Sequence, residues 1–395
     1  MPIFDQGYQH WKGRLSGHAW RWLAIARHGV RTQLGAWYVR LLIIMAWIPA
    51  LVLVAALACW GLLEQGVLGS ESLPWFVALL IKSSDLHACR QAVWTIAYSY
   101  FFDTELFFIM LLVTLTGPNL ISRDLRFNAL PLYLSRPLTR LDYFVGKLGV
   151  IAVLVALVAV LPAVVAYVLG VCFSLDLSVV RDTWRLLPAS ILYGLVIVVS
   201  AGTLMLALSS LSRRSLYVGL AWVGIWLITS SVSGVLEGIH MNTVRMETWR
   251  QQHESETVEA PPRRPGYRGR RGMSPRFDDE SVQAALAKAA KTDWRRLFSY
   301  TANLQRLGEA ALNTDAAWVK IGRVLGSSQS QTAMMFEVSS GQWSVDEPQP
   351  PNERSMADEK VPQYPWTWSA AVLAGLLGIS LWIVSMRVRS LDRLR

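Results

Sequence analysis

The sequence has few charged residues. Only 17% of its 395 residues are Asp, Glu, Lys or Arg, whereas 53% belong to the hydrophobic set, and the mean hydropathy is +0.32. An ordinary soluble domain carries about 25% charged residues and a lower apolar content. The composition therefore argues against a single water-soluble enzyme and predicts a polytopic membrane protein.

Cysteine is scarce as well. Cys59, Cys89 and Cys172 are too few for a disulfide framework, and neither CxxC nor a Cys/His metal spacing occurs. In the topology derived below, all three fall near the outer face of the membrane. We expect free thiols, and a single disulfide is the alternative. The six histidines are scattered along the chain, so no metal site is predicted.

Motifs of catalysis are missing too. No HExxH or GxSxG motif is present. An ATPase needs GxxxxGK followed by Ser or Thr, because the backbone N–H groups of that loop cradle phosphate. The closest segment, Tyr143 to Lys147 (YFVGK), lacks the first glycine and the hydroxyl residue. The chain is therefore not expected to be an enzyme, and no catalytic residue or cofactor is assigned to it.

Long apolar runs, in contrast, are plentiful. A helix that crosses about 30 Å of hydrocarbon needs about 20 apolar residues. Six stretches meet this requirement and predict an all-α integral membrane protein with six transmembrane helices. They are Leu41 to Leu63, Tyr100 to Ile121, Leu148 to Phe173, Leu187 to Leu208, Leu216 to Leu236 and Trp366 to Met386.

Two acids interrupt the second stretch. Asp103 and Glu105 are expected at its outer end, as interfacial groups that direct their charges to the headgroup region. A role in a substrate path is the alternative.

Basic residues are distributed unevenly among the short connections. Seventeen Lys and Arg fall in the N-terminal segment, the connection after the second span, the Ser212 to Ser215 turn and the C-terminal tail, against four on the other side. Cytoplasmic loops of membrane proteins carry such an excess. Both termini are therefore predicted to be cytoplasmic, and the net charge of +10 is a topology signal.

Residues 1–40 form the first predicted unit. Between Trp11 and Arg27, Trp, Leu and Ile alternate with Lys and Arg, a pattern typical of a helix lying in the headgroup region. We predict a cytoplasmic amphipathic interfacial helix. Residues 41–236 then carry spans one to five, and residues 366–395 carry span six with a basic cytoplasmic tail.

Residues 237–365 form an outer insertion between spans five and six. The segment carries seventeen basic and seventeen acidic side chains, so it is neutral. Its part from His253 to Glu280 is rich in Pro, Gly and charge, as expected of a weakly ordered loop. From Val282 to Leu325, Ala, Leu and Trp recur at helical spacing, which predicts two or three amphipathic helices. Acidic neighbours cancel its basic GYRGRR patch, so no nucleic-acid partner is expected.

The connection between the second and third spans carries the most specific pattern. It reads GPNLISRDLRFNALPLYLSRPLTRLDYFVGKL from Gly117 to Leu148. It contains a helix-competent piece, Ser122 to Leu130, and the backbone around Pro137 is restricted. Here the sequence resembles the ABC-2-type transporter permeases, the membrane subunits of ATP-driven exporters. The matching positions are Gly117, Asp124, Tyr133, Leu134, Ser135, Arg136, Pro137, Arg140, Tyr143, Gly146 and Lys147.

The resemblance implies a partner and a role for this connection. Within residues 117–147, the Ser122 to Leu130 piece would serve as a coupling helix that sits in a cleft of a separate ATP-binding subunit. That subunit would be present in two copies and would bind the ATP and Mg²⁺. A second permease copy or homologue would complete a dimer in the lipid bilayer of a prokaryotic plasma (inner) membrane. The residues assigned to this coupling segment are Ser122, Arg123, Asp124, Leu125, Arg126, Arg136, Pro137, Arg140, Gly146 and Lys147.

The predicted function is that of a permease subunit that exports a substrate the residues do not identify. One alternative is a permease-like subunit that transports nothing and passes ATP-driven motion to an extracytoplasmic partner through residues 237–365. A third interpretation is an ion-coupled secondary transporter. That class needs charged residues in mid-membrane, and the predicted spans offer only Asp103 and Glu105.

Overall fold

The computed structural model describes residues 20–66, 86–128, 139–174, 176–259, 280–321 and 364–392. Within these residues every regular element is a helix and no strand occurs. Six helices are long and apolar enough to cross a membrane, which confirms the predicted all-α membrane fold and the number of spans. They cover Trp37–Glu64, Cys89–Arg126, Arg140–Ser174, Ser178–Leu211, Ser215–Thr248 and Trp366–Arg387.

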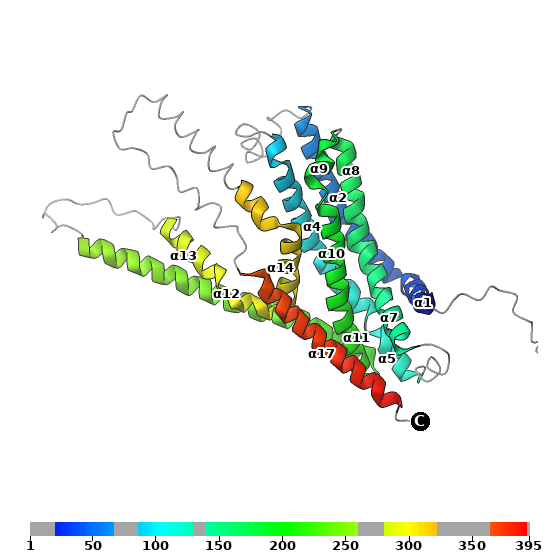
Figure 1. Cartoon of the computed structure of the whole chain (residues 1–395). Coiled ribbons are helices and arrows are strands. Elements are labelled where there is room, and N and C mark those ends of the chain that lie inside the picture. Colours follow the sequence, from blue (N-terminus) through cyan, green and yellow to red (C-terminus); the bar gives the residue numbers. More distant parts are fainter. Residues whose placement is uncertain are drawn as a thin grey trace, which may run out of the picture.

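The first four spans make up the packed bundle in Figure 1. Span one is α2 (Trp37–Glu64) and span two begins as α4 (Leu86–Thr116). Span three joins α7 (Arg140–Val155), the π-helical turn η3 (Ala156–Val160) and α8 (Leu161–Ser174). Span four joins α9 (Ser178–Thr183), α10 (Leu186–Ile197), the π-helical turn η4 (Val198–Gly202) and α11 (Thr203–Leu211).

Aromatic rings fill the centre of this bundle. Trp94 on α4 packs edge-on against Tyr167 on α8, with ring centroids 5.7 Å apart. Gly170 lies beneath the Trp94 ring, where a Cβ atom would approach the ring to 2.8 Å. Phe102 meets Tyr193 on α10 in the same edge-on way at 5.1 Å. Such pairs add about 0.5–1.5 kcal/mol each beyond the apolar area they bury.

The helix that precedes span one is α1 (Arg21–Gly35). It overlaps the C-terminal half of the predicted interfacial helix, and residues 1–19 lie outside the described residues. α1 packs along α7 (Figure 1), and glycines allow a close approach. A Cβ atom at Gly146 would lie 2.8 Å from the Ile25 Cβ and 2.9 Å from the Trp22 carbonyl oxygen. The two backbones are therefore in near contact.

An ion-pair cluster closes the bundle at the ends of α2 and α4. Arg90 is almost fully buried and makes two-pronged contact with Glu64, with the shortest N–O distance 2.8 Å. Nη1 donates to the Ser178 hydroxyl at 2.7 Å and reaches Asp182 at 3.4 Å, while Nη2, which binds Glu64, also reaches Asp176 at 3.4 Å. The cluster joins span one, span two, the connection after span three and the start of span four. All three cysteines are free thiols.

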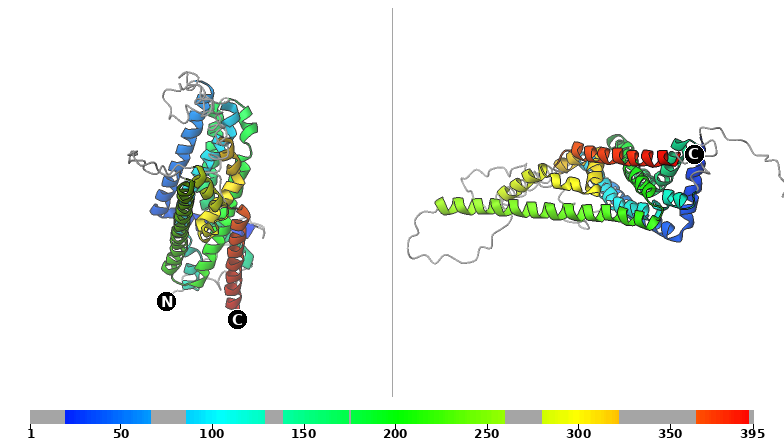
Figure 2. Two further views of the ribbon diagram at one scale, coloured as in Figure 1. Left: turned by 90° about the vertical axis from the view of Figure 1, so that its left-hand side faces the viewer. Right: turned by 90° about the horizontal axis from the view of Figure 1, so that it is seen from below.

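Span five belongs to a much longer helix, α12 (Ser215–Glu259). Its 45 residues extend about 67 Å at about 1.5 Å per residue, more than twice the hydrocarbon thickness of about 30 Å. Figure 2 shows α12 projecting beyond the bundle. The predicted boundary at residues 236–237 thus falls inside a continuous helix. Residues 260–279, most of the expected loop, lie outside the described residues.

The remaining described part of the insertion consists of short helices. They are α13 (Glu280–Lys291), the 3₁₀ turn η5 (Trp294–Phe298), α14 (Tyr300–Leu312) and a helical turn at 314–321. This agrees with the amphipathic helices predicted for residues 282–325. Span six, α17 (Trp366–Asp392), follows and contacts both α11 and α14.

One face of α14 packs against the spans. Tyr300 and Leu304 are buried in the core that the spans build, and the Tyr300 hydroxyl lies 3.0 Å from that of Ser200. Gly308 lies against the Tyr193 ring. A Cβ atom at position 308 would come within 2.6 Å of an atom of that ring. The insertion is therefore continuous with the transmembrane core and is not a separate outer module.

Candidate functional site

The short helix α5 (Asn119–Arg126) lies near the start of the predicted coupling segment, residues 117–147. It begins three residues before the predicted helical piece Ser122 to Leu130 and ends at Arg126. It follows α4 after a break at Gly117 and Pro118, where proline cannot supply a helical N–H. A Cβ atom at Gly117 would lie 2.3 Å from the Met205 side chain and 2.7 Å from the Val113 carbonyl oxygen. Glycine at this position lets the turn fit against α11.

A serine from another helix caps the start of α5. The Ser209 hydroxyl on α11 accepts hydrogen bonds from the backbone N–H groups of Ile121 at 3.1 Å and Ser122 at 3.0 Å. It donates to the Pro118 carbonyl at 2.9 Å. The first N–H groups of a helix have no partner within it, so Ser209 satisfies donors that would otherwise be buried unpaired. α5 is thereby fixed to span four.

A second connection joins α5 to span three. The Lys147 ammonium on α7 lies 2.7 Å from the Asp124 carboxylate, and the Tyr143 hydroxyl donates to the same oxygen at 2.7 Å. The ammonium also lies 5.4 Å from the centre of the Tyr143 ring. Side-chain exposures of 13% for Lys147 and 16% for Asp124 show that water is largely excluded. Charge-assisted bonds in such surroundings are stronger than neutral ones.

The outer face of α5 is exposed and basic. Leu120, Ile121 and Ser122 are buried against the bundle, while Arg123 and Arg126 point away from it. The Arg126 guanidinium lies 5.7 Å from the centre of the exposed Phe127 ring. Together Arg123, Arg126 and Phe127 present two cations and one aromatic ring, which we term the α5 contact face.

The structure brings together several members of the predicted segment. Asp124 and Lys147 bond directly, and Gly146 provides the contact with α1. Leu125 is half-buried beside the core, and Arg140 is the first residue of α7, exposed. Arg136 and Pro137 lie outside the described residues. The capping box of Thr139 and Asp142 starts α7.

Asp103 and Glu105 lie elsewhere than expected along their helix. α4 begins at Leu86, well before the predicted start at Tyr100, so both acids stand near the middle of α4 and not at an end. Glu105 has 0% exposure, and neither carboxyl oxygen has a hydrogen-bond partner among the described residues. The substrate-path interpretation stays a prediction.

Two charged clusters escaped the sequence interpretation. Arg90 counts among the basic residues of the outer connections, yet it is the centre of a buried ion-pair cluster. Arg296 and Arg306 of the insertion pair with Glu237 and with Asp315 and Glu309. The acids that neutralise Arg90 and Arg296 are distant in the chain, so no local spacing reveals these pairs. Arg306 instead pairs with nearby acids, and the i,i+3 spacing to Glu309 is a signal that the sequence did contain. No group of His, Cys, Asp and Glu that could hold a metal occurs in the part of the chain that the structure describes.

The described part of the chain thus has six helices able to span a membrane and a short basic helix after the second of them. A family model described as ABC-2 family transporter protein matches residues 78–336, well over half of the chain. The chain belongs to this family and is a multi-pass permease subunit of an ABC transporter, not itself the ATPase. No curated protein and no solved structure matched the chain.

Proposed function

We propose that this permease exports a substrate with energy from ATP hydrolysed in a separate ATP-binding subunit, and that α5 is the coupling helix. The observation that carries the proposal is the construction of α5: one side is bonded to two spans, and the other exposes Arg123, Arg126 and Phe127. A partner that binds the exposed side of α5 and displaces it would also displace the two spans to which α5 is bonded. Export is the direction usual in the family.

The bonds of α5 define the route of that movement. Ser209 fixes α5 to span four, and Lys147 fixes it to span three. A displacement of α5 by closing nucleotide sites would therefore move both spans as connected bodies, a known mode of switching. Two ATP-binding subunits would bind the ATP and Mg²⁺, and a second permease copy or homologue would complete the dimer. The setting is a prokaryotic inner membrane with both termini in the cytoplasm.

The test is purification of the tagged chain in mild detergent, with mass spectrometry of co-purifying proteins and an ATP hydrolysis assay. We expect a protein with a phosphate-binding loop at one copy per permease, together with ATPase activity. Reversing the charge in Arg126→Glu should abolish this association, as should Arg136→Glu in the same connection. Arg181→Glu, on exposed α9, is the matched control and should retain the partner.

Recovery of the chain alone, without ATP hydrolysis, would refute the coupling role of α5. That outcome would favour the ion-coupled secondary transporter, for which the buried Glu105 carboxyl on α4 would be the first group to examine.

A specific observation also supports a second function, the passing of motion to an extracytoplasmic partner. Arg296 on η5 pairs with Glu237 on α12, and Arg306 on α14 bonds to the Tyr364 carbonyl just before α17. The insertion is thus tied to spans five and six, whose movement it would follow. Deleting residues 282–325 would remove the buried Tyr300 and disturb the bundle. A deletion of α13 alone is the sharper test: ATPase association should persist while crosslinks to the outer partner disappear.

A further inference from the structure

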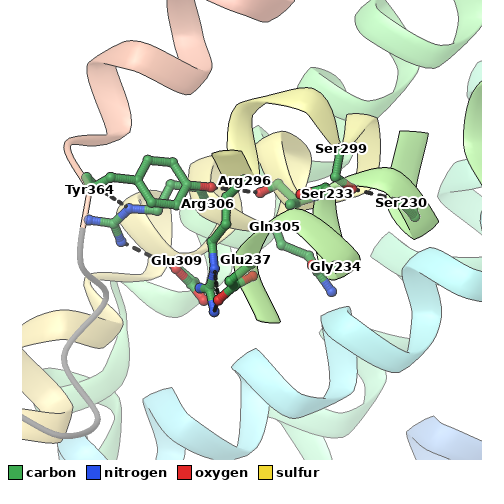
Figure 3. Close-up of a pocket in the computed structure, with 11 residues that line it drawn as sticks. Ser230, Ser233, Gly234, Glu237, Arg296, Ser299, Gln305, Arg306, Glu309 and Tyr364 are labelled. Carbon is green, nitrogen blue, oxygen red and sulfur yellow. Dashed lines mark hydrogen bonds and ion pairs between the residues drawn. The ribbon is translucent and has the colours of Figure 1, made fainter. Parts of the chain in front are cut away.

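A polar pocket lies where the insertion meets span five and the start of span six. Ser230, Ser233, Gly234 and Glu237 of α12 form one wall, η5 and α14 form the floor, and Tyr364 closes the side near α17 (Figure 3). These positions lie near the middle of α12 (Ser215–Glu259), beside the start of α17, where Tyr364 lines the same pocket.

The pocket has a volume of about 270 Å³. A single water needs about 10–15 Å³, and pockets for drug-sized ligands occupy about 300–1,000 Å³. The space is therefore suited to a polar group of several heavy atoms and is too small for a large ligand to be enclosed.

One ion pair of the pocket is accessible. Arg296 and Glu237 have side-chain exposures of 38% and 23%. The Arg296 Nε and one terminal nitrogen both contact Oε1 of Glu237, at 2.7 and 2.5 Å. This is not the parallel two-by-two arrangement in which a guanidinium binds both oxygens of a carboxylate. The pair is thus open to exchange with a ligand.

The second arginine of the pocket, Arg306, is in contrast buried and fully engaged in hydrogen bonds and ion pairs. Arg306 has 6% side-chain exposure, donates to the Tyr364 carbonyl at 2.9 Å and binds Asp315 through two nitrogens at 3.1 and 3.0 Å. It also reaches Glu309 at 3.2 Å. Arg306 therefore holds Glu309 at the pocket wall, while Arg296 remains the cation that a ligand can approach.

Exposed apolar side chains flank the pocket on the helices that cross the membrane. Leu227 is exposed on α12 about one turn before Ser230, and Trp366 and Trp368 are exposed at the start of α17. Tryptophan at the end of a span is typical of the headgroup level of a bilayer. A charged pocket beside exposed apolar side chains at the headgroup level can bind the polar end of an amphiphile while its apolar part stays in the bilayer.

We propose that this pocket binds the zwitterionic headgroup of a phosphoethanolamine lipid. The phosphate would face Arg296, the ammonium would face Glu237 and Glu309, and the acyl chains would lie along α12 and α17. Because the pocket walls carry two arginines and two glutamates, a zwitterion can replace the Arg296–Glu237 pair and leave no charge unpaired. An anionic headgroup would leave Glu237 without its cation, which is costly in a partly buried site. The inference goes beyond ATP coupling and does not depend on it.

The test uses the full chain, purified in detergent and depleted of lipid, with native mass spectrometry and thermal unfolding as readouts. Three probes are compared: dioleoyl-phosphatidylethanolamine, dioleoyl-phosphatidylglycerol and soluble glycerophosphoethanolamine. We expect the first to bind at least about tenfold more tightly than the other two, and to raise the melting temperature. Arg296→Gln should abolish this preference.

Arg295→Gln is the matched control, because the adjacent Arg295 pairs with Asp293 and does not line the pocket. It should bind the lipid as the unaltered chain does. If Arg296→Gln does not fold, the double variant Glu237→Gln with Arg296→Gln keeps the pocket neutral and should show the same loss. Equal binding of the two lipids would overturn the proposal, as would equal binding by the pocket variants and the control. Soluble headgroup binding as tight as that of the lipid would overturn the lipid assignment. None of these outcomes bears on ATPase association.

Discussion

Lys147 and Tyr143 converge on one atom, the Oδ2 oxygen of Asp124. The ammonium and the hydroxyl each lie 2.7 Å from it, so a single carboxylate oxygen on α5 takes two donors from span three. All three residues belong to the sequence pattern that resembles the ABC-2 permeases. Their contact explains physically why an Asp, a Tyr and a Lys stand at these positions of the pattern.

Removing the Lys147 ammonium should weaken both folding and coupling. We expect Lys147→Met to lower the free energy of unfolding by about 1.5–3 kcal/mol, the range for hydrogen bonds to charged groups, and to reduce substrate-dependent ATPase activity of the complex. Tyr143→Phe removes only the neutral donor and should cost about 0.5–1.5 kcal/mol. Denaturant unfolding and an ATPase assay measure the two effects.

Arg213→Met, in the exposed turn before α12, is the control for that pair and should change stability by less than about 0.5 kcal/mol. Unaltered stability and coupling in Lys147→Met would show that the contact with Asp124 has no role in either.

Gly146 should tolerate no side chain. Gly146→Ala places a Cβ atom 2.8 Å from that of Ile25, so α1 must move away from α7. We expect a loss of about 1–3 kcal/mol, as for other overpacked contacts. Gly35→Ala, at the end of α1 with no atom within 4 Å of the new Cβ, should be neutral or stabilising by up to about 1 kcal/mol. Thermal unfolding of the two variants side by side decides the matter, and similar melting temperatures would contradict the close contact.

Arg90 should be among the most sensitive positions of the bundle. Arg90→Met leaves the buried Glu64 carboxylate without its cation, and breaking a buried pair in this way typically costs about 3–5 kcal/mol. The double variant Glu64→Met with Arg90→Met should recover much of that loss. Chemical denaturation of the two variants, with Arg213→Met in the exposed turn before α12 as the control, measures the difference. A double variant no better than Arg90→Met alone would exclude the ion pair as the cause.

Glu309 should make stability fall as the pH rises. Burial raises the pKa of Glu309 above its ordinary value of 4.5, and the Arg306 cation only partly opposes this. Between the unfolded and the folded pKa the native state holds more protons than the unfolded state, so the free energy of unfolding decreases with pH in this window. Glu309→Gln removes the effect, and its melting temperature should exceed that of the unaltered chain increasingly above about pH 4.5.

Asp176 offers a control of opposite sign. The Ser178 hydroxyl and N–H lower the pKa of Asp176, so its stabilising contribution is present above the unfolded pKa and is lost on acidification. Asp176→Asn should therefore reduce stability at neutral pH and have no effect in acid. Parallel melting curves for the Glu309 and Asp176 variants would contradict both assignments.

The sequence predicted the number of spans because each contains a long apolar run, which hydropathy detects directly. It misplaced the start of span two, since Arg90 interrupts that helix and Glu64, 26 positions earlier, neutralises it. Asp103 and Glu105 were therefore predicted at the end of the helix, whereas they lie near its middle. Long-range pairing of charges is invisible to a window of neighbouring residues.

The insertion shows a different limit. Helical spacing indicated that α14 has an apolar face, and Tyr300 and Leu304 do occupy such a face. The periodicity of apolar residues predicts that one face of a helix is buried. It does not identify the surface that covers this face, so the packing of α14 on the spans could not be predicted. In the coupling segment, Asp124, Gly146 and Lys147 were assigned from the family pattern, whereas the capping by Ser209 has no sequence signal.

The near contact of α1 and α7 at Gly146 and Gly149 has a mechanical consequence. The Trp22 carbonyl and Ala26 meet the α7 backbone directly, so α1 cannot tilt or slide without carrying α7 with it. Lys147, one residue after Gly146, holds α5 through Asp124. An amphipathic helix responds to the lipid composition and curvature of the surface on which it lies. α1, α7 and α5 are therefore connected in series, so a displacement of α1 would be passed through α7 to α5.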